Sequence, residues 1–118
     1  MYYITTKNYN KCMEIAKQAI ESIPKAHNRK RIKKENEVLK QEVIKYRQPL
    51  NNLDIKLCDG FVFEDKQNLG TNRFTDYFTR VNIWIHKIQK TTDKCIYISD
   101  YTKYRKSSVL AYVVNKEV

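Results

Sequence analysis

Residues 80–90, RVNIWIHKIQK, alternate in a way that is typical of a β-strand. The aliphatic side chains take the odd-numbered positions, and the only tryptophan, Trp84, takes an even-numbered position with Arg80 and His86. Such a strand has two chemically different faces. The aliphatic face is expected to pack in a core, and the opposite face, which carries the indole and the cation, is the candidate for function.

The alternation continues after a short turn and predicts a β-hairpin over residues 78–102. Side chains that face each other across a hairpin share one side of the sheet. The register that keeps the isoleucines of both strands together places Trp84 beside Tyr97. Arg80 and Tyr101 would then lie at the far end of the same face.

The first part of the chain has helical rather than alternating periodicity. Residues 2–6 are β-prone, and residues 9–23 then repeat apolar side chains at three- and four-residue spacing. Thr6 or Asn8 is expected to cap this helix, and Pro24 is expected to end it. The sequence therefore predicts a short strand followed by an amphipathic helix.

A second helix is predicted over residues 29–47, with Asn28 as its cap and Pro49 beyond its end. Its first turns belong to a basic segment, KAHNRKRIKK, residues 25–34, which contains no acidic side chain. We call this segment the basic block. Its six cations are Lys25, Arg29, Lys30, Arg31, Lys33 and Lys34.

Further strands are predicted after the second helix. Residues 53–57 alternate, Asp59 and Gly60 form a tight turn, and FVFED, residues 61–65, returns as the partner strand. A polar loop follows, up to about residue 77. The late segment VLAYVVN, residues 109–115, is apolar on both faces, which indicates an interior strand.

These elements predict a single α+β domain over residues 1–118. It would contain a short N-terminal strand, two helices, and a mostly antiparallel sheet of four to five strands with the helices on one face. A homodimer that pairs through residues 109–115 or through the second helix is left open.

A formal net charge of +10 favours a polyanionic partner, because basic surfaces attract phosphates and release their counterions. Residues 1–50 carry 12 positive and 5 negative side chains, against 11 and 8 in the remaining residues. The charge excess therefore lies mainly in the helical half. The basic block either contacts nucleic acid or forms an ordinary solvated surface.

No metal site and no cofactor site are predicted. Cys12, Cys58 and Cys95 form no CxxC pair, and His27 and His86 add no ligand cluster. No apolar run approaches the roughly 20 residues of a membrane span, and the first residues lack the apolar middle of a signal peptide. We therefore expect a cytoplasmic protein with reduced thiols and no membrane partner.

One enzymatic alternative comes from the segment TRVNIWIHKIQKTTDKCIYISDYTKYRKS, residues 79–107. It is similar to the central hairpin and basic, tyrosine-containing segment of the RelE-type mRNA interferases. The resemblance implies cleavage of RNA without a metal, by basic and tyrosine side chains. The positions that would act here are Arg80, His86, Tyr104 and Arg105; no other catalytic residue is predicted.

The function predicted from the sequence is binding of RNA, single-stranded DNA or a nucleoprotein complex by a small basic accessory or regulatory protein. The abundance of Lys, Asn, Ile and Tyr, 48 of 118 residues, is common in phage and mobile-element genes. A phage-type anti-defence inhibitor that docks on a host protein such as a nuclease is the alternative. Packing in the core or at a protein interface would also explain the aromatic face. The predicted nucleic-acid contacts are the basic block together with Arg80, Trp84, His86, Tyr97, Tyr101, Lys103, Tyr104, Arg105 and Lys106.

Overall fold

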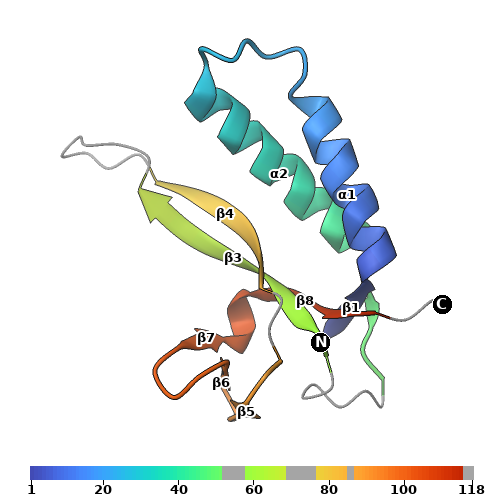
Figure 1. Ribbon diagram of the computed structural model, residues 1–118, viewed down its shortest axis with the longest axis vertical. Coiled ribbons are helices and arrows are strands. Elements are labelled where there is room, and N and C mark those ends of the chain that lie inside the picture. The colour runs from blue at the N-terminus through green and yellow to red at the C-terminus, as the bar shows by residue number, and fades with distance from the viewer. Residues whose placement is uncertain (52–57, 69–76, 85–86, 116–118) are drawn as a thin grey trace.

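The computed structural model describes residues 1–51, 58–68, 77–84 and 87–115, with backbone only at 66–68, 77–80, 82 and 84. It has the predicted α+β architecture, with two long helices beside a central sheet and a second, smaller sheet on the other side (Figure 1). The elements are β1 (Tyr2–Thr5), α1 (Thr6–Ala19), α2 (Asn28–Tyr46), β2 (Gln48–Pro49), β3 (Gly60–Asn68), β4 (Tyr77–Trp84), β5 (Lys90–Thr91), β6 (Cys95–Tyr97), β7 (Lys103–Arg105), the 3-10 turn η2 (Lys106–Ser108) and β8 (Val109–Val114).

The central sheet has the strand order β2-β1-β8-β3-β4. Its strands pair antiparallel except β1 and β8, which run parallel with Tyr3 opposite Tyr112. β8 lies in the middle of the sheet, and each of its residues from Leu110 to Val114 is at most 7% exposed. The prediction of an interior strand is confirmed. A strand covered on both faces needs apolar side chains at every position, which explains why this segment lacks alternation.

The first helix is shifted from its predicted position. Its cap is Thr5, whose Oγ1 accepts a hydrogen bond from the Asn8 backbone N–H at 3.2 Å, so neither Thr6 nor Asn8 is the cap. α1 ends at Ala19, several residues before Pro24, so the proline does not terminate it. α2 matches its predicted range within one residue, but its N-cap is His27, which makes no side-chain cap hydrogen bond.

Both helices cover one face of the central sheet. The core between them is built from Cys12 and Ala16 of α1, Leu39 and Val43 of α2, and the sheet residues around Val62, all of them buried. α2 also protects the edge strand β4, because the Val81 backbone N–H donates to the Asn36 side-chain oxygen at 3.1 Å. This bond satisfies one of the N–H groups that an edge strand otherwise leaves open for pairing with another chain.

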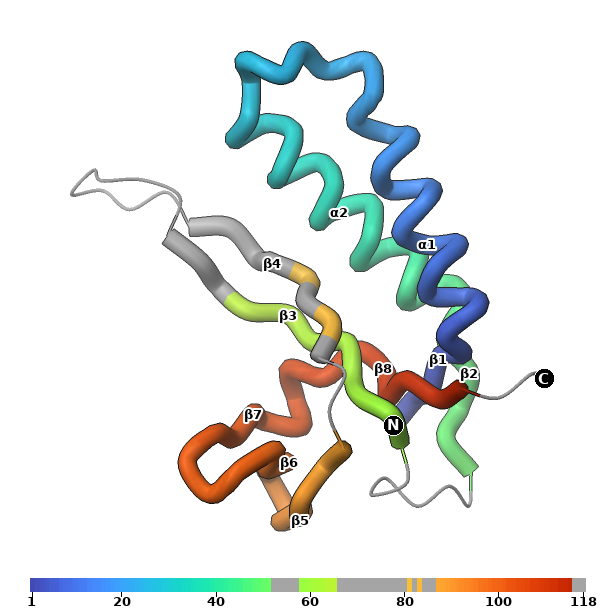
Figure 2. The backbone as a smooth tube through the Cα atoms, in the orientation of Figure 1, coloured from blue at the N-terminus to red at the C-terminus, as the bar shows by residue number. Residues whose placement is uncertain are grey.

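The opposite face of the central sheet packs on the small sheet, whose strand order is β5-β6-β7 (Figures 1 and 2). Phe61, Phe63 and Tyr112 of the central sheet form a second buried cluster with Ile96 of β6 and Ile88, the residue two positions before β5. The central sheet is therefore sandwiched between the helices and the small sheet. Because both faces of the central sheet are buried, its interior strands carry apolar side chains at odd and even positions alike.

Of the hairpin predicted over residues 78–102, only the part next to the turn forms, as β5 and β6, and its register differs from the predicted one. β4 pairs with β3, with Trp84 opposite Phe61, whereas β6 pairs with β5, with Tyr97 opposite Lys90. Trp84 and Tyr97 thus belong to different sheets. Alternation assigns a residue to a face of its strand but does not choose the neighbouring strand, and the prediction failed at that step.

The strand predicted over residues 61–65 forms, and its neighbours are β8, along residues 60–63, and β4, along residues 61–68. Residues 53–57, the predicted partner, lie outside the described residues. Gly60 is not a turn residue but the first residue of β3. The predicted polar loop is partly strand, because β3 continues to Asn68 and β4 begins at Tyr77.

Candidate nucleic-acid interface

One side of the small sheet faces solvent and gathers positive charge. Ile96 is fully buried beneath β6, so its neighbours Cys95 and Tyr97 point the other way. The register pairs Arg105 with Cys95, and both Lys103 and Lys90 with Tyr97. We call this side, with Lys90, Cys95, Tyr97, Lys103 and Arg105, the outer face. Its three cations are exposed, while Cys95 and Tyr97 are half-buried.

Tyr104 lies on the inner side of the same strand. Its ring packs against Phe61 and Phe63, with centroids 5.3 and 4.5 Å apart. Burial and, to a lesser extent, the negative charge of Asp65 raise the pKa of its hydroxyl. The ring predicted to stack on bases is therefore packed in the second core cluster. Because Arg105 is its neighbour on the opposite side of β7, the two residues do not converge on one reaction centre.

The Tyr97 ring makes a cation–π contact with Lys90. Lys90 Nζ lies 4.6 Å from the ring centroid, a distance at which an ammonium group is attracted by the face of the ring. The pair places a positive charge directly beside an aromatic surface on the outer face. An aromatic ring and a cation are thus adjacent, and this is the combination that single-strand-binding surfaces use.

A second tyrosine extends from the loop between β6 and β7. Tyr101 is 98% exposed. The loop backbone is nevertheless held in place, because Ser99 Oγ accepts hydrogen bonds from the N–H groups of Tyr101 and Thr102 at 3.4 and 3.1 Å. Gln89 also donates to Asp100 at 3.2 Å across the base of the loop. A ring presented to solvent by a well-connected loop is positioned for contact with a partner.

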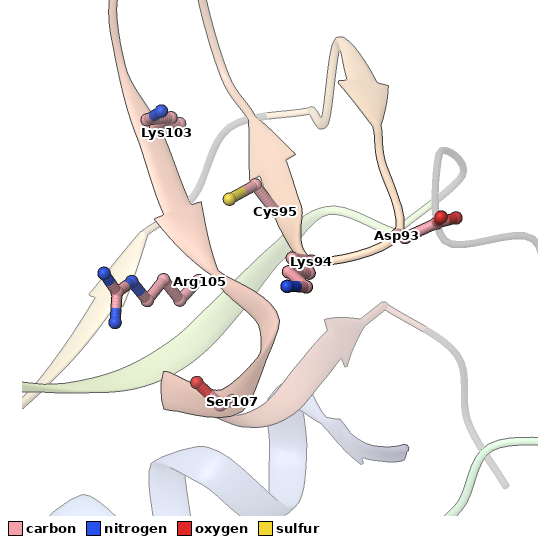
Figure 3. A pocket seen from close by; sticks show the side chains of 6 residues that line it. All are labelled: Asp93, Lys94, Cys95, Lys103, Arg105 and Ser107. Atoms are coloured by element: carbon pink, nitrogen blue, oxygen red, sulfur yellow. The ribbon is translucent and has the colours of Figure 1, made fainter.

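A pocket of about 790 Å³ opens on the outer face where β6 and β7 meet η2 (Figure 3). The Lys106 backbone N–H donates to the Lys94 carbonyl at 2.8 Å and so ties η2 to the turn before β6. Thr92 closes that turn, donating its own N–H to the Cys95 carbonyl at 2.9 Å. The pocket is lined by Asp93, Lys94, Cys95, Lys103, Arg105 and Ser107.

The basic block lies elsewhere. The connection between α1 and α2 and the small sheet occupy opposite ends of the longest axis, along which the molecule measures 44 Å (Figure 1). Lys25, Lys30, Lys33 and Lys34 are exposed there. Arg31 is not available as a surface cation, because its Nη1 donates to the carbonyls of Ile20 and Ile23 at 3.1 and 2.6 Å.

The predicted contacts are therefore separated into groups. Tyr97, Lys103 and Arg105 share the outer face, Tyr101 is at its loop, and the half-buried Lys106 is in η2. Of Arg80 and Trp84 the structure describes only the backbone, within β4, and His86 lies outside the described residues. Sequence reasoning missed Lys90, Lys94, Cys95 and Ser107. The strand with Tyr97 was predicted to pair with the strand that contains Trp84, whereas its neighbours are β5 and β7.

Buried ionisable groups elsewhere offer no reactive centre. Burial raises the pKa of Cys12 to about 11, and the negative charge of Glu42 adds to this effect. Burial likewise raises the pKa of Tyr9 and of Tyr112 to about 12. These groups are protonated at neutral pH. Within the described part of the chain, no set of three His, Cys, Asp or Glu side chains is arranged to hold a metal ion, and no helix is long and apolar enough to cross a membrane.

Comparison with known proteins gives no relative on which to base a function. No protein-family model, no curated protein and no solved structure matches this chain.

Proposed function

We propose that the protein binds single-stranded nucleic acid, RNA or DNA, through the outer face of the small sheet. The observation that carries the proposal is the alternation of cations with a tyrosine ring on one exposed side of β5, β6 and β7. Cations bind the backbone phosphates and the rings stack on bases. The role that follows is that of a small accessory or regulatory protein of the phage or mobile-element type, acting by binding without catalysis.

The spacing of the cations supports this proposal. Lys103 and Arg105 are two residues apart on β7, which corresponds to about 7 Å along a strand. Lys90 lies two strands away, at about 5 Å per strand. The three charges therefore form a flat cluster rather than a line. Such a cluster can contact successive phosphates of a flexible single strand.

The tyrosines favour a single strand over a duplex. In a duplex the bases are stacked on one another and present only their edges, so a ring cannot lie against them without unstacking. Tyr97 and Tyr101 are both near the outer-face cations. Each base stacked on a ring contributes about 1–3 kcal/mol of binding free energy. The basic block is retained in the proposal as a second, separate phosphate contact.

The test is the salt dependence of binding to labelled single strands of about 12 nucleotides, a length within the site sizes of single-strand binders. The three phosphate contacts of the outer face alone predict a slope of about −2 in log affinity against log salt, or about 20-fold weaker binding when salt rises fourfold from about 50 mM, and contacts by the basic block make the slope steeper. A duplex of the same sequence should bind more weakly. Absence of binding, or binding that does not change with salt, would contradict the proposal.

A second candidate function is inhibition of a host protein by docking, as phage-type anti-defence proteins do. The full exposure of Tyr101 favours it, because tyrosine is enriched among residues that dominate protein interfaces. A protein complex anchored by this ring should lose little affinity over the same salt range. Pull-down from host lysate at high salt, followed by loss of the captured protein in a Tyr101→Ser variant, would favour this candidate over the first.

A further inference from the structure

The pocket at the end of the outer face has a charge pattern of its own. Its lining comes from four neighbouring parts of the chain: the turn before β6, β6 itself, β7 and η2 (Figure 3). Three of its six lining side chains are cations: Lys94, Lys103 and Arg105. Among the described residues, none of these three has a carboxylate within salt-bridge distance. The one acidic lining residue, Asp93, is set apart, with its carboxylate directed away from Lys103 and Arg105 (Figure 3).

The backbone around the pocket is fixed before any ligand arrives. The Cys95 N–H donates to Thr92 Oγ1 at 3.1 Å, and the Lys106 N–H donates to the Lys94 carbonyl at 2.8 Å. Cys95 and Arg105 face each other across the ladder of β6 and β7. Cations that line one pocket without salt-bridge partners among the described residues repel one another, and an anion bound in the pocket relieves that repulsion. A fixed backbone lowers the ordering cost of binding such an anion.

We infer that this pocket binds the terminal phosphate of a nucleic-acid strand, an inference that rests on the proposed function. A terminal phosphomonoester carries a charge of about −2 at neutral pH, because its second pKa is about 6, whereas an internal phosphodiester carries −1. Three cations therefore favour the end of a strand over its interior. The Ser107 hydroxyl adds a hydrogen-bond donor for a phosphate oxygen.

The size and position of the pocket agree with a strand end. A volume of about 790 Å³ is within the range of roughly 300–1,000 Å³ for small-ligand pockets and exceeds what a phosphate group alone needs. The terminal sugar and base can enter with it. The rest of the strand then leaves along the outer face, where Tyr97 stands opposite the pocket residue Lys103.

Three strands of one sequence test the inference: one with hydroxyls at both ends, one with a 5′ phosphate and one with a 3′ phosphate. Each is measured as RNA and as DNA by fluorescence anisotropy against the full-length protein. At pH 7.5 we expect one phosphorylated end to bind about 10-fold more tightly than the hydroxyl strand, and the two phosphorylated strands show which end is recognised. At pH 5.5 the preference should shrink, since the phosphomonoester then carries about one charge less.

Variants separate the pocket from the rest of the outer face. Arg105→Gln and Ser107→Ala should each bring the ratio of the affinity for the preferred phosphorylated strand to the affinity for the hydroxyl strand towards one. Lys90→Gln removes a cation of the outer face that does not line the pocket, so it should weaken all strands and keep the ratio. Lys11→Gln, an exposed position on α1, should change neither affinity nor ratio.

The outcomes distinguish this inference from the proposed function. Equal affinities for phosphorylated and hydroxyl strands, with the salt dependence intact, would overturn the pocket assignment and leave the proposed function standing. Failure of every strand to bind would overturn both. A phosphoserine peptide that displaces the phosphorylated strand at equal concentration would assign the pocket to a protein ligand and so overturn the inference as well.

Discussion

The protein has two basic regions, and they differ in what accompanies the charge. The basic block has six cations within ten residues and no acid. The outer face has only three, at positions 90, 103 and 105, and they are dispersed in the sequence. In the structure the block surrounds the start of a helix, with one arginine engaged in holding the end of α1. The outer face instead combines its cations with a tyrosine ring and a pocket.

This difference shows that the density of charge along a chain does not tell which cations the fold brings together with aromatic side chains. A helix distributes consecutive residues around its axis at 3.6 per turn, so a basic run becomes a broad charged surface. A β-ribbon collects every second residue of several strands on one side. Lys90, Tyr97, Lys103 and Arg105 become neighbours in this way. The proposed ligand contact at the outer face therefore depends on the small sheet keeping its pairing.

The largest predicted effect comes from removing a buried side chain that supports the outer face from below. Ile96 is fully buried on the inner side of β6, against the cluster that includes Phe61 and Tyr104. Ile96→Ala should lower the free energy of unfolding by about 2–5 kcal/mol, because it leaves a cavity as well as losing apolar burial. Urea unfolding followed by circular dichroism measures the loss.

The matched control is Ile44→Ala, which makes the same change at a side chain of α2 that is 42% exposed. This variant should lose well under about 1 kcal/mol, as surface substitutions usually do. The affinity of the folded protein for nucleic acid should fall for Ile96→Ala and stay unchanged for Ile44→Ala. Full affinity in a destabilised Ile96→Ala protein would mean that the outer face is not the binding surface.

The second prediction compares the two sets of cations directly. Replacing Lys90, Lys103 and Arg105 with glutamine should weaken single-strand binding by about 10- to 50-fold at low salt and make the salt slope shallower by about 2. Replacing Lys30, Lys33 and Lys34 with glutamine removes the same charge from the basic block. This second variant should weaken binding by less than about 5-fold. Titrations at several salt concentrations measure both quantities, and the reverse ranking would move the site to α2.

Much of the fold could be predicted from periodicity. The second helix, the first strand and the interior strand β8 were predicted close to their observed ranges, and the first helix was predicted three to four residues too late. Strand partners could not be predicted. β3 pairs with β8, more than forty residues later in the chain, and nothing local in FVFED distinguishes that neighbour from one nearby.

The candidate interface was predicted in part for the same reason. Tyr97 was expected beside Trp84, and Lys103 and Arg105 were expected in a basic segment at the end of the hairpin; in the structure Tyr97, Lys103 and Arg105 lie on one face. Lys90 was missed because the ladder of β5 and β6 sets it opposite Tyr97, in the place that the predicted hairpin gave to Trp84. Tyr104 was predicted on the binding surface because its strand neighbours are basic, yet the period-2 rule places it on the inner side.

The smallest predicted effect concerns the basic block itself. It distinguishes a cation that stabilises the fold from a cation that is free to contact a ligand. Arg31 donates to the carbonyl of Ile20, which caps α1 and also accepts the Ile23 N–H, and to the carbonyl of Ile23 in the connection to α2. Arg31→Met should therefore lower the free energy of unfolding by about 1–2 kcal/mol, since hydrogen bonds from a charged group are lost while the apolar stem is kept. Lys30→Met, at an exposed neighbour, should leave stability within about 0.5 kcal/mol. Thermal melting with parallel binding titrations measures both variants.

If the block were a single phosphate-binding unit, the two substitutions would lower affinity equally. If Arg31 is structural, its loss should reduce stability more than affinity, and the ligand-binding charge of the block then consists of its remaining exposed cations.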